Sequence, residues 1–273
     1  MSQSLQRTDR VARRVRHEVK RRMLQVRDVH PLTPKMLRVT LAGDDLTGFV
    51  SAAHDDHVKL FFPPPGEEKP AMPTLTPNGP VYPDGMPRPA ARDYTPRRYD
   101  AAANTLIIDF VLHGDGPAAS WAAQARPDQF LGVGGPRGSF IVPDDFDWYA
   151  FVGDETALPA IGRRLEELPA GTRAIIVAEV ADAGERQNFV TRANLETHWL
   201  YRDGAGPGTL LRDATAQLKL PGGDGYTWIA AEAATAKALR RLLVEERSLR
   251  KDRVKAAAYW KQGAVAVHET YDD

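Results

Sequence analysis

Three polar side chains with complementary chemistry lie close together near the middle of the chain: Arg92, Tyr94 and Thr95. If this segment is a strand, Arg92 and Tyr94 point to the same face. A guanidinium can make two parallel hydrogen bonds to a phosphate, and a phenol can cover an aromatic ring while its hydroxyl hydrogen-bonds. A ligand with both a phosphate and a large ring system, such as a flavin nucleotide, would suit all three groups. Taken alone, the residues fit an edge strand with ordinary surface side chains at least as well.

A second candidate site is the helix start predicted after the stretch His113-Gly114-Asp115-Gly116-Pro117. Pro117 suits the first turn of a helix, and the unpaired backbone N–H groups of a helix start can bind an anion. Small residues at Gly116, Ala118 and Ala119 leave room for a phosphate to approach. A plain capped helix also explains the stretch. Together with the upstream arginine and tyrosine, we predict a pyrophosphate site.

The composition limits the possible classes of function. With 42% hydrophobic and 26% charged residues among 273, this is a globular chain long enough for two domains. Lys and Arg balance Asp and Glu at 36 each, which favours neither nucleic acid nor an anionic membrane as a partner. No apolar stretch suits a membrane span or a secretory signal, so we expect a cytoplasmic protein. Since the chain has no cysteine, redox chemistry would need a borrowed cofactor.

The first half of the chain predicts strands without intervening helices. The expected strands are Leu24–Val29, Met36–Leu41, His57–Phe62, Thr105–Leu112 and Phe130–Val133, in addition to the strand that holds Tyr94. Residues 63–91 are rich in Pro and Gly and predict a long loop, and residues 134–140 predict a tight turn. Short strands joined in this way indicate a small antiparallel β-barrel.

Residues 1–22 are strongly basic. Val11, Val15 and Val19 could form a thin apolar stripe, but we expect a frayed, solvated arm and assign it no function. The residues from Pro143 to Asp147 predict a linker. The expected divisions are therefore a basic arm at residues 1–22, a barrel domain at 23–145 and a second domain at 146–273.

The second half alternates strands and helices. Continuous apolar runs predict buried strands at Trp148–Val152, Ala174–Val180, His198–Tyr201, Tyr226–Ala231 and Val254–Trp260, with helices ending at Leu168 and spanning Ala234–Glu246. This alternation indicates a doubly wound parallel sheet, whose ligands bind beyond the carboxyl ends of the strands. Gly153–Thr156, Glu232 and Tyr259–Lys261 fall at that edge.

The four residues His54, Asp55, Asp56 and His57 suggest a metal site at first sight. Adjacent residues cannot all turn toward one ion, so we predict a solvated cluster and no metal.

Several spaced blocks carry a family resemblance. The pattern Arg-x-Tyr-Thr-x-Arg at residues 92–97 resembles the flavin-binding signature of the siderophore-interacting proteins, ferric-siderophore reductases related to the ferredoxin–NADP reductase superfamily. The resemblance continues through residues 113–121, 135–140, 153–160 and 259–263, and spans most of the chain beyond about residue 20. It implies an antiparallel β-barrel that binds flavin, followed by a parallel-sheet α/β domain that binds a nicotinamide nucleotide.

The resemblance also implies the cofactor site. The helix start would receive the FAD diphosphate, with His113 near the flavin. The predicted cofactor-binding residues are Arg92, Tyr94, Thr95, Asp109, Val111, His113, Gly116, Ala118, Ala119, Ser120, Trp121, Asp154 and Thr156. No side chain need act as acid, base or nucleophile in an electron transfer, so we predict no catalytic residue.

The nicotinamide site is the weaker part of this prediction. The chain has no Gly-x-Gly-x-x-Gly fingerprint, and the carboxylates of Asp154 and Glu155 would repel a nearby phosphate. NADPH or NADH is expected as electron donor by resemblance. Arg202, Arg163 and Arg164 are candidates for contact with a 2′-phosphate, but we expect these arginines to be solvated.

Ferric siderophores are often anionic, so cations near the flavin would attract them. The matched positions are Lys59 and Lys261, and we add Arg137, which lies in the turn between Gly135 and Gly138 and could also be solvated. Ala258 and Ala231 stand where the family commonly has glycine, which affects the fine geometry of the neighbouring blocks.

The function implied is reduction of siderophore-bound Fe(III) by NAD(P)H through FAD, with release of Fe(II). A reductase that serves a ferredoxin, flavodoxin or free flavin is the nearest alternative, and a ferredoxin is a further possible electron donor. A non-enzymatic siderophore-binding protein is the alternative from a different class. Bound flavin in the purified protein would argue against that last alternative.

Overall fold

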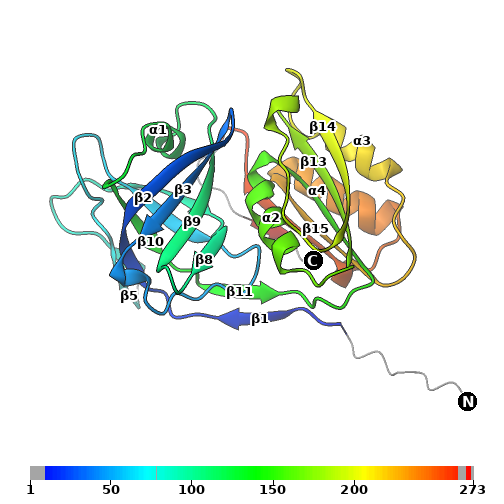
Figure 1. Ribbon diagram of the computed structural model, residues 1–273, viewed down its shortest axis with the longest axis horizontal. Helices are drawn as coiled ribbons and strands as arrows, with labels where there is room; N and C mark the ends of the chain where they lie inside the picture. The colour runs from blue at the N-terminus through cyan, green and yellow to red at the C-terminus, as the bar shows by residue number, and fades with distance from the viewer. Residues whose placement is uncertain (1–9, 78, 264–268, 272–273) are drawn as a thin grey trace, which may run out of the picture.

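The chain folds into an antiparallel half-barrel and an α/β layer that pack side by side (Figure 1). This computed structural model describes residues 10–77, 79–263 and 269–271. No helix within those ranges combines the length and apolar character needed to traverse a lipid bilayer.

The half-barrel is a seven-stranded sheet with the strand order β7-β4-β10-β2-β3-β9-β8. Its strands are β2 (Arg21–Thr33), β3 (Met36–Ala42), β4 (Val58–Phe62), β7 (Ala90–Tyr94), β8 (Arg98–Asp100), β9 (Thr105–Val111) and β10 (Phe130–Gly134). Every neighbouring pair is antiparallel. The outer strands β7 and β8 do not pair with each other, so the curled sheet stays open on one side. The predicted antiparallel β architecture is confirmed at this level.

Alternating apolar residues fill the inside of the half-barrel. Leu24 and Val26 of β2, Val39 and Leu41 of β3 and Leu60 of β4 are at most 2% exposed and belong to one cluster. Helix α1 (Pro117–Ala123) packs Ala118 and Ala122 against the same cluster. The predicted long loop contains a small hairpin, β5 (Thr74–Thr76) with β6 (Gly79–Val81), which the sequence did not predict.

The expectation of a frayed N-terminal arm is wrong for the residues that the structure describes, although Arg13, Arg14 and Arg16 are exposed as expected. Strand β1 (Arg13–Arg16) pairs with β11 (Gly138–Ile141), so the basic segment is part of a two-stranded ribbon. Arg22 is 4% exposed, donates to the Gly135 carbonyl at 2.9 Å and stacks over Phe49. Residues 1–9 lie outside the described residues.

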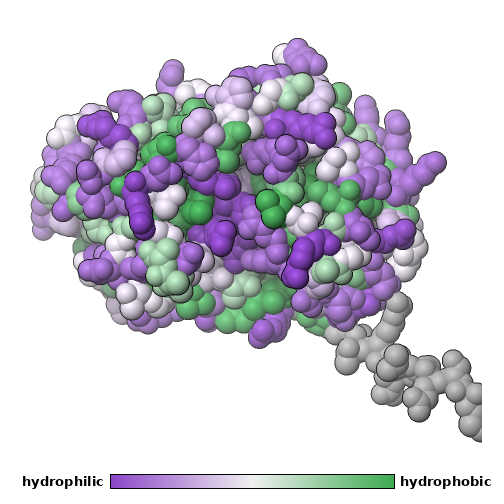
Figure 2. Space-filling model, viewed as in Figure 1, coloured by the Kyte–Doolittle hydropathy of each residue, from purple (hydrophilic) through white to green (hydrophobic). Residues whose placement is uncertain are grey.

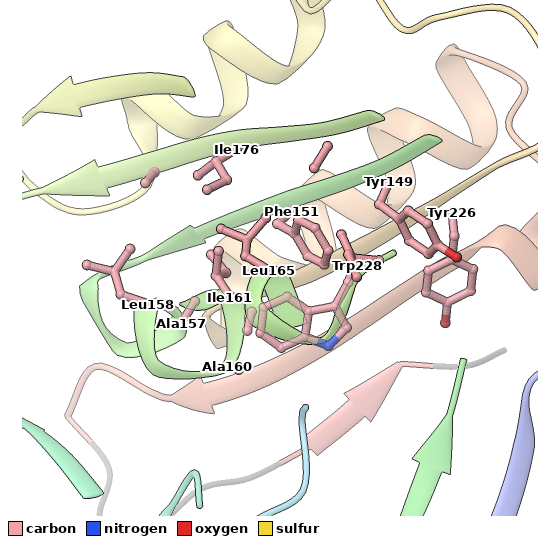
Figure 3. Packing of buried hydrophobic residues seen from close by; sticks show 14 of the residues in the cluster. Tyr149, Phe151, Ala157, Leu158, Ala160, Ile161, Leu165, Ile176, Tyr226 and Trp228 are labelled. Carbon is pink, nitrogen blue, oxygen red and sulfur yellow. The ribbon is translucent and has the colours of Figure 1, made fainter. Parts of the chain in front are cut away.

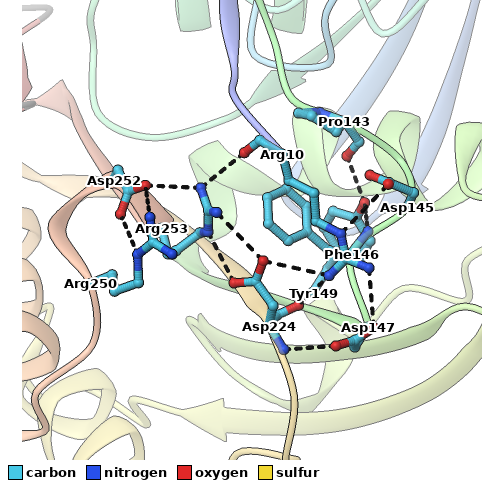
Figure 4. Close-up of polar contacts among 10 residues, drawn as sticks. All are labelled: Arg10, Pro143, Asp145, Phe146, Asp147, Tyr149, Asp224, Arg250, Asp252 and Arg253. Atoms are coloured by element: carbon cyan, nitrogen blue, oxygen red, sulfur yellow. Dashed lines mark hydrogen bonds and ion pairs between the residues drawn. The ribbon is translucent and has the colours of Figure 1, made fainter. Parts of the chain in front are cut away.

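Arg10 attaches the beginning of this ribbon to the α/β layer (Figure 4). Its guanidinium lies between Asp145, Asp147 and Asp224 at 3.2–3.5 Å, and its carbonyl accepts a hydrogen bond from Arg253 at 2.9 Å. These acidic partners come from two segments that are far from Arg10 in sequence. The single cation therefore joins three parts of the chain.

The α/β layer is a six-stranded sheet with the order β14-β13-β12-β15-β16-β17. Its strands are β12 (Trp148–Asp154), β13 (Arg173–Val180), β14 (Asn194–Tyr201), β15 (Gly225–Glu232), β16 (Val254–Trp260) and β17 (Glu269–Tyr271). The first five in this order are parallel, and β17 pairs antiparallel with β16. Parallel strands covered on both faces need apolar residues throughout, which explains the continuous apolar runs in the sequence.

Helices cover the two faces of this sheet. Helix α2 (Leu158–Glu167) lies on the face toward the half-barrel, where Phe151, Trp228 and Ile161 share a cluster (Figure 3). Helices α3 (Thr209–Gln217) and α4 (Ala233–Arg241) pack on the opposite face, and α4 continues into a π-helical stretch, Leu242–Glu246. Short 3-10 turns occupy Asp44–Leu46, Glu155–Ala157, Ala183–Glu185 and Lys251–Arg253.

The cluster between the halves also contains residues of the half-barrel. Met36 of β3 is fully buried there, and Leu32, Val111 and Phe140 pack against it. The apolar core is therefore continuous from the barrel to the sheet through the α2 face. This contact fixes where the barrel strands lie relative to the carboxyl ends of the parallel strands.

Gly153, at the end of β12, offers a test of this close packing. A Cβ there would lie 2.4 Å from the Ala230 carbonyl oxygen and 2.5 Å from the Ala157 Cβ. Because a backbone atom cannot move aside, Gly153→Ala should lower the free energy of unfolding by about 1–3 kcal/mol in urea titrations. Gly222→Ala is the control, since an added methyl there meets no atom of the described residues within 4 Å. Equal stability of the two variants would contradict the packing described.

Candidate functional site

Strand β7 presents the two residues that define the predicted flavin motif. On the neighbouring strand β4, Arg92 lies opposite Leu60 and Tyr94 lies opposite Val58. Because Leu60 and Val58 belong to the barrel core, Arg92 and Tyr94 lie on the side of the sheet that faces this core. The Tyr94 ring packs on Phe110 with centroids 4.6 Å apart, and burial raises the pKa of its hydroxyl. Arg92 donates only to the neighbouring Ala91 carbonyl and has no carboxylate partner within the described ranges. Its charge is available to an anion.

Three other predicted cofactor residues already have protein partners. Asp109 is 4% exposed and accepts two hydrogen bonds of 2.7 Å from Arg38, with Arg97 at 3.8 Å. Thr95 is buried and hydrogen-bonds the Tyr259 side chain, and Val111 packs in the core between the halves. These contacts give the three residues a structural role, and their contact with a cofactor stays a prediction.

The predicted helix start has the geometry of an open anion site. Gly114 adopts a φ of 55°, a left-handed conformation that favours glycine, and the chain then enters α1 at Pro117. Gly116 is the N-cap and supplies no side-chain hydrogen bond, so the first N–H groups of the helix have no capping partner from it. The predicted contacts His113, Ser120 and Gly116 are exposed, while Ala118 and Ala119 are buried.

A cleft of about 760 Å³ lies beside α1 and strand β7. Its walls come from residues 62–68 of the long loop, Arg88 and Ala90, from Pro117, Ser120, Trp121 and Gln124 of α1, and from residues 126–129. The volume falls within the range of about 300–1,000 Å³ that is typical of cofactor clefts. In the cleft wall, the indole nitrogen of Trp121 is buried and has no hydrogen-bond partner among the residues that the structure describes. A buried donor without an acceptor in the protein is a group that a bound ligand could satisfy.

Aromatic rings connect this cleft with Tyr94. Phe110 lies between Tyr94 and Trp121, with centroid distances of 4.6 and 5.6 Å, and Trp121 also contacts Phe62 at 5.7 Å. These aromatic rings lie on the same side of the half-barrel sheet as the Arg92 side chain. Arg92 and Tyr94 are not among the residues that line the cleft. A ligand that contacts the cleft, the uncapped helix start and the Arg92 guanidinium would therefore be long, with a flat ring system and phosphates, as FAD has.

A second cavity, of about 330 Å³, lies between the β1–β11 ribbon and strand β16. It is lined by Arg14, Val15, Arg16, Asp55, Asp56, His57, Arg137, Gly138, Ser139, Phe140, Lys255, Ala257, Tyr259 and Thr270. Cations outnumber carboxylates in this wall, and Figure 2 shows hydrophilic side chains gathered where the two halves meet. The cavity suits an anionic ligand.

Lys255 is a residue of this cavity that the sequence analysis missed. Its ammonium is 2.6 Å from Asp55 and 3.9 Å from the centre of the Phe140 ring, and the side chain is 9% exposed. A lysine inside a buried parallel strand is rare, because burying a charge is costly without a partner. The single charge in the run Val254–Trp260 was the signal that could have revealed it.

The prediction of a solvated cluster at residues 54–57 is wrong. His54 is 3% exposed and lies against the rings of Phe151 and Trp228, and its burial lowers the pKa of the imidazole to about 3. Asp56 accepts hydrogen bonds from Ser139 at 2.6 Å and Ser51 at 2.8 Å, and burial raises the pKa of its carboxyl. The polar residues are buried because the two halves close over them. In residues 10–77, 79–263 and 269–271, no group of three or more His, Asp or Glu is placed to hold a metal.

The three predicted substrate cations occupy different surroundings. Lys59 forms an ion pair of 2.7 Å with Asp93 on the neighbouring strand, and it lies opposite Gly134, just before the turn that carries Arg137. Arg137 is exposed and lines the second cavity. Lys261 is exposed immediately after β16 and lines neither cavity. The structure thus brings Lys59 and Arg137 into one region through the register of β4 and β10.

At the carboxyl ends of the parallel strands, acidic side chains bind the turns that follow. Asp154 accepts hydrogen bonds from the Thr156 N–H at 2.9 Å, from the Thr156 hydroxyl at 2.5 Å and from the Trp260 indole at 2.8 Å. Glu179 accepts from the N–H groups of Gly208 and Leu211 at the start of α3. Glu232 in the same way caps α4. The helix starts that could attract a phosphate here are occupied by the protein's own carboxylates.

The expectation that Arg163, Arg164 and Arg202 are solvated is also wrong. Arg202 is 14% exposed and forms an ion pair with Glu155 as well as a 3.4 Å contact with Glu179. Arg163 donates to the hydroxyl and the carbonyl of Ser51, and Arg164 donates to the carbonyls of residues 142 and 143. All three guanidiniums bind groups of the protein itself. None of these three arginines is therefore a solvated side chain that could bind a 2′-phosphate.

The half-barrel and α/β layer together have the ferredoxin reductase-like fold that solved flavin- and NAD-binding proteins share. The family model described as "Siderophore-interacting FAD-binding domain" matches residues 25–140, and the one described as "Siderophore-interacting protein" matches residues 146–263. The chain belongs to the siderophore-interacting protein family.

Relatives match over nearly their whole length. The NADPH-dependent ferric-chelate reductase of Escherichia coli is 38% identical over 93% of this chain and 98% of its own. The ferric vibriobactin reductase ViuB of Vibrio cholerae is 34% identical over 87% and 89%. A solved siderophore utilization protein from T. fusca has 41% identity and a TM-score of 0.86, and covers 94% of this chain and 98% of its own.

The Asp154 carboxyl gives a pH-dependent prediction. Burial raises its pKa from 3.8 to about 6, so between these values the folded protein binds a proton that the unfolded chain does not. The free energy of unfolding therefore rises as the pH falls through this window. The Asp154→Asn variant lacks this contribution, because an amide does not bind the proton. From about pH 7 to about pH 4, the stability of the unaltered protein relative to the variant should increase by up to about 3 kcal/mol. Urea titrations at a series of pH values measure it, and a pH-independent difference would contradict the burial of this charge.

Proposed function

We propose that this protein is an FAD-dependent ferric-siderophore reductase that takes electrons from NADPH. The observation that carries the proposal is the cleft beside α1 and β7, in a chain whose first half matches an FAD-binding family model. The names of two relatives that match along nearly the whole chain, a ferric-chelate reductase and a ferric vibriobactin reductase, support the reaction.

The cofactor would lie against the two partly exposed rings of the aromatic row, Tyr94 and Trp121, because Phe110 and Phe62 are buried in the barrel core. Arg92 and the uncapped start of α1 would bind its diphosphate, Tyr94 would pack against its ring system, and Trp121 would donate its free indole N–H. FAD, when bound, supplies the conversion of a two-electron donor into single electrons. The protein's own residues bind and orient, and none needs to transfer a proton by itself. The residues 23–145 would form this cofactor-binding unit.

The substrate would be an anionic ferric chelate. The second cavity, with the exposed Arg137 in its wall, offers positive charge next to the contact of Tyr259 with Thr95, while Lys255 in the same wall is paired with Asp55. Lys59 and Lys261 lie outside the cavity and would attract the chelate toward it. Because siderophores bind Fe(III) much more tightly than Fe(II), reduction of the metal would release it.

The donor side would be the carboxyl edge of the parallel sheet in residues 146–273, with Asp154 and Thr156 at the first turn. One NADPH gives a hydride, which carries two electrons, and reduces two Fe(III) to two Fe(II) with release of NADP⁺ and one proton. The carboxylates that cap α3 and α4 leave little attraction for phosphates, so we expect weak nucleotide binding. A ferredoxin as the donor and a cytoplasmic location stay predictions of the sequence.

The cofactor site is tested by Arg92→Ala combined with Tyr94→Ala. Loss of the phosphate-binding cation and the packing ring should give a folded, colourless protein, measured by the flavin absorbance of the purified sample. Arg98→Ala, which removes an exposed arginine from β8, is the control and should stay yellow. A double variant that keeps stoichiometric flavin would contradict the assignment of this site.

The substrate site is tested by Arg137→Glu. Reversing an exposed charge in the cavity wall should lower kcat/KM for an anionic ferric chelate by about tenfold or more, and added salt should narrow the difference. Flavin content should not change. Lys237→Glu makes the same change in net charge on α4, which packs on the far face of the sheet. Equal effects of the two substitutions would contradict a local role for Arg137.

A further inference from the structure

The motif at residues 92–97 ends in an arginine that does not face the cofactor cleft. Arg97 is 7% exposed, and its backbone N–H donates to the Ile107 carbonyl of β9 at 2.9 Å. Its guanidinium reaches across to helix α2 and donates to both carboxylate oxygens of Glu166, at 2.5 and 3.2 Å. Since the two residues are 69 positions apart, this ion pair joins the half-barrel to the α/β layer.

The ion pair is the end of an alternating row of charges. Asp109 on β9 lies 3.8 Å from the Arg97 Nε and is bound on its other side by Arg38 of β3. Two guanidiniums and two carboxylates therefore follow each other from the barrel to α2. Removing one member would leave a buried charge without its partner, which fixes the position of Arg97 strongly.

Helix α2 makes a second contact with the same segment. Arg163 donates to the Pro96 carbonyl at 3.0 Å, and Pro96 lies between Thr95 and Arg97. The same guanidinium binds the hydroxyl of Ser51 at 2.7 Å. The three residues after Tyr94 are thus held from the α/β side, two of them by α2 and Thr95 by Tyr259.

Gly162 shows that α2 is shaped for this contact. A Cβ at Gly162 would lie 3.1 Å from Nη2 and 3.2 Å from Nε of Arg97, and 3.2 Å from the Phe189 ring. Glycine inside a helix is destabilising by about 0.5–1 kcal/mol relative to alanine. The close approach of the Arg97 guanidinium to the helix explains why it stands there.

We propose that Arg97 is a positioning residue for electron transfer from the nicotinamide nucleotide. Helix α2 begins directly after the turn at residues 153–157, which lies at the donor edge of the sheet, and Arg97 links this helix to the residues that follow Tyr94. The ion pair is with Glu166 in the last turn of α2, and Arg163, about one turn nearer that edge, binds the Pro96 carbonyl. The two contacts together hold the helix that leads from that edge against the ring-binding segment. The inference rests on the proposed function, because it requires flavin at Tyr94 and Thr95.

The test compares Arg97→Lys, Glu166→Gln and Gly162→Ala with the unaltered protein. Arg97→Lys keeps the charge and loses the forked geometry, while Glu166→Gln weakens the pair at its more exposed end. Each variant should bind FAD stoichiometrically, because Arg92 and the start of α1 are unchanged. The visible circular dichroism of the bound flavin should change, and anaerobic bleaching by NADPH should slow by about 10- to 100-fold. Reoxidation by a ferric chelate should slow much less.

Arg241→Lys is the matched control, since Arg241 forms an exposed pair with Glu245 on the far face of the sheet. It should leave the dichroism and both rates unchanged. Variants that lose thermal stability but keep the dichroism and the bleaching rate would show a purely structural role and overturn the proposal. Loss of FAD from Glu166→Gln or Gly162→Ala would overturn it as well. Absence of flavin from the unaltered protein would instead defeat the proposed function.

Discussion

The burial of arginines between helix α2 and the half-barrel is the constraint on which the rest of the structure depends. Arg163 and Arg164 are each 9% exposed, and burying a guanidinium is costly unless its N–H groups find acceptors. Several of their acceptors are backbone carbonyls, which cannot move as side chains can. The barrel and the sheet are therefore held in one relative position by groups with defined directions, and the second cavity, which is lined by residues of both halves, lies at their contact.

The half-barrel and the parallel sheet differ in how many groups they offer to an anion. At the carboxyl edge of the parallel sheet, Asp154, Glu179 and Glu232 accept the hydrogen bonds of the following turns or helix starts. The start of α1 has no such carboxylate, and Arg92 nearby has no acidic partner in the described part of the chain. A phosphate-bearing cofactor is thus favoured at the barrel and disfavoured at the sheet. This agrees with a firmly held flavin and a nucleotide that arrives and leaves.

Local patterns in the sequence were sufficient for the main strands. Alternation of apolar and polar residues predicts β2 and β3, because only one face of these strands is buried. Continuous apolar runs predict β12 and β13, because both faces of these strands are buried. Strand β1 was missed because its pairing partner β11 is more than a hundred positions away, and its own residues are mostly charged. Helix α3 and strand β17 also have no strong local signal.

The buried charges were the part that a single sequence could not give. Arg10 and Asp224 are 214 positions apart, and Lys255 and Asp55 are 200 apart. An arginine or lysine is ordinarily exposed unless it is paired, so without its partner in view each was predicted to be solvated or was passed over. The strand that holds Arg92 and Tyr94 and the helix start after Gly116 could be predicted, because a strand face and a helix start are local features. The contact of these residues with a cofactor stays a prediction.

An anaerobic titration of the purified protein tests the central claim most directly. The account predicts a yellow protein whose flavin absorbance is bleached by NADPH and restored by a ferric siderophore, with two Fe(II) captured by a chromogenic chelator for each NADPH consumed. A colourless protein that binds the ferric siderophore without reducing it would contradict the account. So would a bleached flavin that the ferric chelate fails to reoxidise.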